Sequence, residues 1–403
     1  MNARERVRAV LNHKIPDWVP CGLGGCETAG LHVLTYEKLQ KSLGVEPKPP
    51  RMDTFMCNAV FEPELLKAMQ GDILMLASPR MCRSPLLHTG VQGQWKNQQL
   101  WGHTISIPVK EHFSQRPDGT MVWESSPGKE ICPPGSFFFD APSATDLLQE
   151  FDYPDPEDYR PDDDFSDDFL RALEETARYW YEETDFCLSL GETITDLQYS
   201  PGGMIGGMVL MMEQPEVMQA YLQKAVDAAL KQITLLEQAV GKYVDILCIA
   251  HDFGDNQGVT IGDELWRRIY KPYYRQLFQG WHARTGMKIN LHTCGSVSSI
   301  LEDLIACGLD IYNPVQTSAK GMTPEELKKR FGDRLIFYGG GYDCQLLPHD
   351  TPAQEVYQKV RQVVGTFKQG GNYIFAGVHN LPADVPQAHL EAMLAAWRDE
   401  RVY

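Results

Sequence analysis

A histidine and a cysteine stand two residues apart in the stretch KINLHTCGSVSSI, residues 288–300. Side chains at positions i and i+2 of an extended segment point to the same side, so His292 and Cys294 could face one metal ion. Imidazole nitrogen and thiolate sulfur are both ligands of zinc in proteins. The same spacing also fits a satisfied histidine and an inert cysteine in a shared core. The pair alone leaves both interpretations open.

Eight short apolar runs predict the strands that would carry such a pair. They span residues 18–22, 72–76, 186–190, 243–250, 287–291, 309–313, 335–339 and 372–376. Helix-like segments follow in the second half of the chain at 214–241, 263–285, 296–307, 324–331, 353–369 and 386–400. A buried strand that alternates with an amphipathic helix is typical of a parallel sheet covered on both faces. We therefore expect an α/β protein, a single (β/α)8 TIM barrel over residues 1–403, with a doubly wound open sheet as the alternative.

The stretch between the second and third predicted strands is too long for one helical crossover. Within it, two extended pieces flank Pro117-Asp118-Gly119, which is a turn signal. We expect residues 81–150 to form a β-hairpin insertion in the barrel and residues 164–184 to form the helix before the third strand. The sequence leaves open whether the insertion is a lid over the barrel mouth.

Polar side chains follow most of the predicted strands at their C-terminal ends, where (β/α)8 barrels place their chemistry. The residues of this rim that we expect to bind a substrate are Glu192, Asp255, Gln257, Tyr342, Asp343 and Asn380. The candidate catalytic residues are Asp252, His292 and His379. Glu27, Asn313 and Gln316 lie on the same rim without an assigned role. Aspartates in such loops also cap turns and helices, so a purely structural role for them stays open.

The composition excludes several classes of partner. The formal net charge of −17 argues against nucleic acid and against an anionic membrane surface, since both need clustered lysine and arginine. The chain shows neither a signal-peptide pattern nor an apolar run of the ~18 residues that a membrane span needs. Its ten cysteines form no CxxC pair, which indicates reduced thiols. We expect a cytoplasmic protein with a small-molecule substrate, and a homodimer stays open.

A set of motifs, taken in chain order, resembles the uroporphyrinogen decarboxylase superfamily. The motifs are RERVRAVLNHKIPDWVP, HDFGDNQG followed by DELWRRIYKPYYRQL, LHTCGSV, LDIYNPVQT, GGGYDCQLLP and GVHNLPADVP. The resemblance runs over almost the whole chain and implies a single (β/α)8 barrel. It implies one of two chemistries: the cofactor-free decarboxylation of a porphyrinogen, or methyl transfer with a corrinoid protein, as in the enzymes that methylate coenzyme M and in bacterial O-demethylases.

Departures from the family pattern bear on which of these chemistries to expect. The stretch PCGLGGCETAG lacks the arginines that hold substrate carboxylates in the true decarboxylase, which favours the corrinoid-linked branch. That branch implies zinc at His292 and Cys294, with a further cysteine after the last strand. Here GVHN offers His379 instead. We expect His379 as the third ligand, with Glu192, Asp252 and then Cys344 as alternatives.

The resemblance therefore leads us to expect a zinc-dependent methyltransferase. It would move a methyl group between a small substrate, a methoxy compound or a thiol, and a corrinoid supplied by a partner protein. We favour O-demethylation because nothing in the sequence marks a specific thiol coenzyme. The first alternative is a metal-free lyase in which Asp252, His292 and His379 act by electrostatics and proton transfer. The second is a non-catalytic barrel that binds a small ligand or a corrinoid partner.

Overall fold

The computed structural model describes most of the chain, with gaps. The described residues are 1–54, 56–76, 95–125, 128–140, 153, 155–160, 165–198 and 203–403. None of the helices within these ranges is long and apolar enough to cross a membrane.

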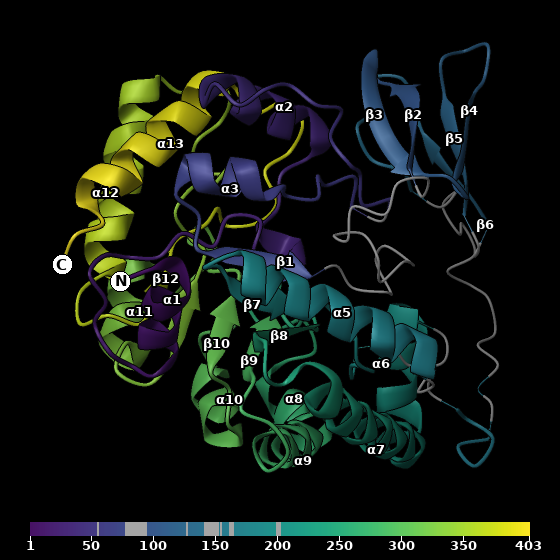
Figure 1. Cartoon of the computed structure of the whole chain (residues 1–403). Helices are drawn as coiled ribbons and strands as arrows, with labels where there is room; N and C mark the ends of the chain where they lie inside the picture. Colours follow the sequence, from purple (N-terminus) through teal and green to yellow (C-terminus); the bar gives the residue numbers. More distant parts are fainter. Residues whose placement is uncertain are drawn as a thin grey trace.

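Seven strands form one parallel sheet whose spatial order follows the chain. They are β1 (Ile73–Leu76), β7 (Cys187–Leu190), β8 (Val244–Ala250), β9 (Lys288–His292), β10 (Ile311–Asn313), β11 (Ile336–Tyr338) and β12 (Tyr373–Ile374). Each coincides with a predicted strand. The sheet is curled as in a TIM-like barrel, with helices on its outer side (Figure 1).

The first predicted strand, residues 18–22, is present only as two isolated bridges, an antiparallel one between Trp18 and Val402 and a parallel one between Cys21 and Phe375. The Phe375 N–H donates to the Pro20 carbonyl group, and the Cys21 carbonyl group accepts from the N–H of Asp72, which directly precedes β1. This short segment therefore hydrogen-bonds to both edges of the sheet. The expectation of a regular strand here is wrong, and one reason is that Pro20 has no N–H to give to a ladder.

Most of the predicted helices are present. In chain order the α-helices are α1 (Ala3–Leu11), α2 (Val33–Ser42), α3 (Pro63–Met69), α5 (Asp167–Glu183), α6 (Gly203–Glu213), α7 (Pro215–Val240), α8 (Asp263–Ile269), α9 (Lys271–His282), α10 (Leu301–Cys307), α11 (Pro324–Phe331), α12 (Ala353–Phe367) and α13 (Gln387–Glu400). The single helix predicted over 263–285 is two helices, because Pro272 starts a new helix in its first turn. A short 3-10 helix, η1 (Glu27–Ala29), follows the Cys21 bridge.

The buried apolar residues form two clusters, as expected of a barrel. A small cluster holds alternate residues of the strands, among them Ile246, Ile311 and Ile374, together with Val7 and Val10 of α1. Side chains on a strand alternate between its two faces, so this cluster is the barrel interior, and α1 covers its N-terminal end. The larger cluster lies between the sheet and the surrounding helices.

The described part of the 81–150 insertion is a pair of small antiparallel sheets set to one side of the barrel helices (Figure 1). Strands β2 (Trp95–Leu100) and β3 (His103–Pro108) form a hairpin, and β4 (His112–Gln115), β5 (Met121–Ser125) and β6 (Gly128–Cys132) form the second sheet. The predicted hairpin is thus confirmed, and the Pro117-Asp118-Gly119 turn joins β4 to β5. The parts of the predicted insertion at 81–94 and 141–150 lie outside the described residues.

Candidate metal centre

Strand β9 and its neighbours bring His292 to the C-terminal end of the sheet. His292 is the last residue of β9, and the parallel register pairs it with Ala250 on β8 and with Asn313 on β10. Cys294 follows two residues later, in the loop that begins at this rim. His379 lies in the loop after β12, close to the opposite edge of the same sheet. Two segments far apart in the sequence therefore place three ligand-type side chains on one rim.

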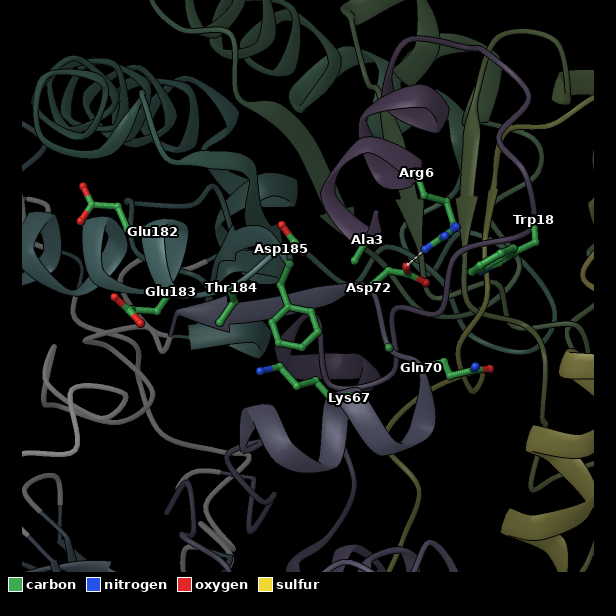
Figure 2. Close-up of a pocket in the computed structure, with 12 residues that line it drawn as sticks. Ala3, Arg6, Trp18, Lys67, Gln70, Asp72, Glu182, Glu183, Thr184 and Asp185 are labelled. Atoms are coloured by element: carbon green, nitrogen blue, oxygen red, sulfur yellow. Dashed lines mark hydrogen bonds and ion pairs between the residues drawn. The ribbon is translucent and has the colours of Figure 1, made fainter. Parts of the chain in front are cut away.

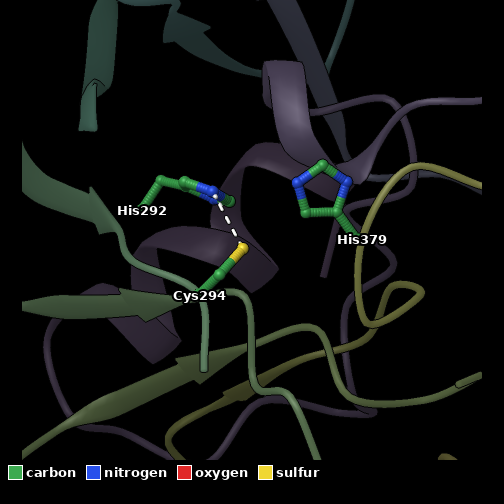
Figure 3. Close-up of side chains that lie close together, drawn as sticks. All are labelled: His292, Cys294 and His379. Atoms are coloured by element: carbon green, nitrogen blue, oxygen red, sulfur yellow. Dashed lines mark hydrogen bonds between the residues drawn. The ribbon is translucent and has the colours of Figure 1, made fainter. Parts of the chain in front are cut away.

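The ligand atoms of His292, Cys294 and His379 lie within 4.8 Å of one another. The Cys294 thiol sulfur is 3.4 Å from His292 Nε2. The two imidazole rings are 5.2 Å apart between centroids and inclined at 77°. Figure 3 shows all three side chains directed toward a common centre. Among the residues that the structure describes, this is the one group of three histidine, cysteine or acidic side chains with the spacing of a metal site.

Burial sets the protonation states in this cluster. It lowers the pKa of His292, against the opposing effects of Asp252 and of a hydrogen bond with Asn313. It lowers the pKa of His379 to about 4, and the neighbouring His292 adds to this effect. Burial also raises the pKa of the Cys294 thiol, and Asp252 raises it further. Both imidazoles are therefore neutral at pH 7 and able to ligate, whereas a metal would have to displace the thiol proton.

Asp252 lies beside the pair and not within the group of three. Its Oδ1 accepts a hydrogen bond from the Cys294 backbone N–H at 2.8 Å and lies 3.6 Å from His292 Nε2. The carboxylate is 41% exposed, so it remains open to solvent on its other side. Asp252 thus holds the Cys294 loop and places a negative charge next to the cluster.

The loop after Cys294 can take its path only because residue 295 is glycine. Gly295 has a φ of +84°, and a Cβ atom there would lie 2.5 Å from the carbonyl carbon of Gly254. Its N–H donates to Gln316 Oε1 at 2.8 Å, and the next N–H, of Ser296, donates to the Asp255 carbonyl group at 2.7 Å. These contacts bind the loops after β8, β9 and β10 together and fix the position of Cys294.

Several predicted substrate-binding residues have structural contacts in the loops. Asp255 is exposed, and its Oδ1 accepts from the backbone N–H groups of Gln257 and Gly258, so it closes a tight turn. Gln257 is exposed on that turn. Asn380, next to His379, accepts from the Gly30 N–H at 2.7 Å. Their roles in substrate binding stay predictions.

Tyr342 and Asp343 are buried below the rim. The Tyr342 hydroxyl lies 2.8 Å from Nδ1 of His389 on α13, so it faces the outer helices. His389 is 2% exposed, so this contact is buried. The Asp343 carboxylate accepts from the Thr317 hydroxyl and from the Gln345 N–H, which ties two loops together. The expected substrate contacts of both residues also stay predictions.

Glu27 and Thr28 join the site from η1, although the rim motifs assigned them no role. The Thr28 hydroxyl donates to Asn313 Oδ1 at 2.6 Å, and Asn313 Oδ1 lies 3.2 Å from His292 Nδ1. The Glu27 carboxylate is buried and accepts from the Glu192 backbone N–H at 2.5 Å. Burial, and then the neighbouring Cys26, raise the pKa of Glu27 to about 8. The sequence signal that could have pointed to Glu27 and Thr28 is their position just after the first predicted strand.

A hollow of about 520 Å³ lies at the opposite end of the barrel (Figure 2). Its lining includes Asp72 and Phe186, which directly precede β1 and β7 at their N-terminal ends. The buried Asp72 forms an ion pair with Arg6 of α1 there. Active sites of (β/α)8 barrels lie at the C-terminal rim, so we assign this hollow no part in the candidate site.

Part of the sequence matches a known protein family. Residues 203–400, which include β8 to β12 and all three members of the cluster, match the family described as uroporphyrinogen decarboxylase (URO-D). This region belongs to the uroporphyrinogen decarboxylase superfamily. No curated protein matches the sequence significantly.

Among solved structures, a methyltransferase from Methanosarcina mazei is similar over 99% of both chains, with a TM-score of 0.56 and 15% sequence identity. At this identity the likeness concerns the fold alone. Xylanase B from Clostridium stercorarium F9 covers 54% of this chain and 74% of its own at 11% identity, with a TM-score of 0.34. Dihydropteroate synthase from Xanthomonas albilineans covers 38% and 52% at 18% identity, with a TM-score of 0.25. The last two similarities are too weak to bear on the fold.

Proposed function

We propose that this protein is a zinc-dependent methyltransferase whose metal ligands are His292, Cys294 and His379. The observation that carries the proposal is the convergence of three ligand atoms within 4.8 Å at the C-terminal rim. Two imidazoles and one thiol make a donor set that suits zinc, and catalytic zinc sites typically have three protein ligands and one open position. Both imidazoles are neutral at pH 7, which also suits them as zinc ligands.

The metal would supply Lewis-acid chemistry, either polarising the oxygen of a methoxy substrate or holding a thiolate as methyl acceptor. The chain's own residues supply the rest. Asp252 and Gly295 hold the Cys294 loop in place. His292 itself is buried, which limits the access of water to its ring. Glu27 keeps its carboxyl proton at neutral pH because its pKa is raised to about 8.

The methyl partner would be a corrinoid carried by a separate protein. This part of the proposal rests on the resemblance of the rim motifs to the corrinoid-linked branch, and a structural relative whose name is methyltransferase agrees with it. We favour demethylation of a methoxy compound, in which the oxygen keeps the electron pair of the broken bond and the methyl group goes to the corrinoid.

A metal-free decarboxylase is the second candidate, because the family that matches residues 203–400 is described as uroporphyrinogen decarboxylase. The segment from Pro20 to Gly30 argues against it. This segment supplies Glu27 and Thr28 to the rim and contains no arginine or lysine for the carboxylates of a porphyrinogen.

One experiment separates the two candidates. Native protein is incubated with cob(I)alamin as methyl acceptor and with a panel of methoxy compounds and methylated thiols, and the methylcobalamin spectrum is followed. A parallel sample receives uroporphyrinogen, and its carboxylate loss is measured. We expect methylcobalamin to form only with zinc bound and not in Cys294→Ala. Decarboxylation by metal-free protein would refute the proposal.

A further inference from the structure

Asn313 is the closest polar neighbour of His292 on the side away from Cys294. It lies at the end of β10 in register with His292, and its side chain is fully buried. Its Oδ1 is 3.2 Å from His292 Nδ1. A side chain buried in this position has to satisfy its own polar atoms within the protein.

Two further contacts fix which way the Asn313 amide points. Its Nδ2 donates to the Tyr338 carbonyl group on β11 at 3.1 Å, and a carbonyl oxygen cannot face another acceptor in that place. On the other side, the Thr28 hydroxyl donates to Oδ1 at 2.6 Å. Because Nδ2 must meet Tyr338, Oδ1 must meet His292. An amide oxygen only accepts, so His292 Nδ1 has to carry the hydrogen.

The other ring nitrogen of His292 shows the complementary pattern. Nε2 lies 3.4 Å from the Cys294 sulfur, so the thiol can donate its hydrogen to a bare Nε2. The competing acceptor, Asp252 Oδ1, is 3.6 Å from Nε2 and already accepts from the Cys294 N–H. Both sides of the ring therefore favour the same tautomer.

We propose that Asn313, held by Thr28 and Tyr338, is a positioning residue that fixes His292 as the Nδ1–H tautomer and turns the Nε2 lone pair toward the metal position. A metal-bound histidine usually passes its second N–H to such an acceptor, which orients the ring and strengthens the ligand. The metal part of this proposal rests on the proposed function. The tautomer is a property of the metal-free chain.

The first readout needs no metal. Long-range ¹H–¹⁵N spectra of the metal-free protein at pH 7 report which nitrogen of each histidine ring is protonated, and the His292 signals are assigned by their loss in His292→Gln. We expect native His292 to be protonated at Nδ1 only. Asn313→Leu should lose that preference, and Thr28→Val, which removes one hydrogen bond and keeps Asn313, should weaken it.

The second readout is zinc affinity, measured by competition with a chelator. We expect Asn313→Leu to bind zinc about 10- to 100-fold more weakly, which is the usual effect of losing such a partner. Asn313→Asp keeps an accepting oxygen toward His292 but sets a second acceptor against the Tyr338 carbonyl group, so its zinc affinity should lie between those of native and Asn313→Leu. Asn290→Leu is the matched control, because Asn290 is equally buried on β9, two residues before His292, and bonds to the Cys248 sulfur.

The two readouts distinguish the possible failures. A native protein that binds no zinc but shows the Nδ1–H tautomer would refute the proposed function and leave the role of Asn313 intact. A native His292 protonated at Nε2, or an Asn313→Leu variant with native zinc affinity, would overturn the role of Asn313. Should Asn313→Leu not fold, Thr28→Val with the native tautomer and affinity would overturn it equally.

Discussion

Protonation states in the cluster determine what zinc binding must displace. Burial lowers the pKa of His292 and of His379, so both imidazoles are neutral at pH 7. Neither therefore has to lose a proton when zinc binds. It raises the pKa of the Cys294 thiol, which therefore holds one. Zinc takes cysteine as a thiolate, so binding must expel the proton of this thiol.

We therefore expect zinc binding at pH 7 to release about one proton per chain. Calorimetric titrations in buffers of different ionisation enthalpy measure this number directly. Cys294→Ser is the control and should lower both the affinity and the proton release. Release of no proton would mean that the thiol is already ionised in the metal-free protein, in conflict with its burial.

Glu27 links pH to stability. Its pKa is raised to about 8 in the folded chain, from the ordinary value of 4.5. At a pH between these two values, Glu27 is protonated in the folded chain and ionised in the unfolded chain. The contribution of Glu27 to stability therefore falls as the pH rises through this window. Glu27→Gln removes this dependence. We expect the free energy of unfolding of the variant, relative to native, to rise by about 2–4 kcal/mol from pH 5 to pH 8.

Urea denaturation of both proteins at the two pH values measures this change. Glu264→Gln, which alters an exposed carboxylate at the start of α8, is the control and should show the same pH dependence as native. An equal pH dependence in native and Glu27→Gln would contradict a raised pKa at Glu27.

At the scale of elements, the loop after β9 depends on Gly295. A side chain there would meet the backbone of Gly254 and Asp255, and its positive φ would also be strained. We expect Gly295→Ala to lower stability by about 1–3 kcal/mol and to weaken zinc binding by moving Cys294. Gly258→Ala, where open space surrounds the added carbon, should be nearly neutral. Native zinc affinity in Gly295→Ala would show that this loop does not fix the site.

Helix α1 is held to the N-terminal end of the barrel by Arg6 and Asp72. The two groups pair in the interior, with side-chain exposures of 5% and 1%. Loss of one partner leaves the other charge buried, so we expect Arg6→Met to cost about 3–5 kcal/mol of unfolding free energy. The more exposed pair of Arg8 with Asp245 offers a control, and Arg8→Met should cost about 1 kcal/mol or less. Equal costs, measured by denaturant unfolding, would contradict a structural role for the buried pair.

How far the sequence predicts these elements depends on how local the signal is. Strands β7 to β12 are apolar runs next to amphipathic helices, so their positions follow from periodicity. The segment at Cys21 is extended, yet whether it pairs as a strand depends on both edges of the sheet, which lie far away in the sequence. The split between α8 and α9 at Tyr270 is a case where the Pro272 signal was present and the continuous helical pattern outweighed it.

The candidate site, too, could be predicted only in part from the sequence. His292 and Cys294 are neighbours on one strand end, and residue type with barrel topology placed His379 on the same rim. The roles of Asn313 and Thr28 could not be predicted, because both depend on hydrogen-bond directions between three separate elements. Tyr342 was expected at the mouth, whereas its hydroxyl pairs with His389 of α13, a residue far away in the sequence.

At the scale of the whole molecule, the two ends of the barrel have separate tasks. The N-terminal end carries α1, the Arg6–Asp72 pair and an open hollow. The C-terminal end carries the His292–Cys294–His379 cluster, with the loops that hold it. This division is the one expected of a (β/α)8 enzyme, in which stability and chemistry occupy opposite faces.

The proposed function depends on one zinc ion at the C-terminal rim. The most direct measurement is the metal content of protein purified without chelator, by plasma mass spectrometry, for native chain, Cys294→Ala and His379→Ala. We expect about one zinc per native chain and far less in both variants, each still folded by circular dichroism. A folded native protein without zinc, or a Cys294→Ala variant that retains it, would rule out a zinc site made by these residues.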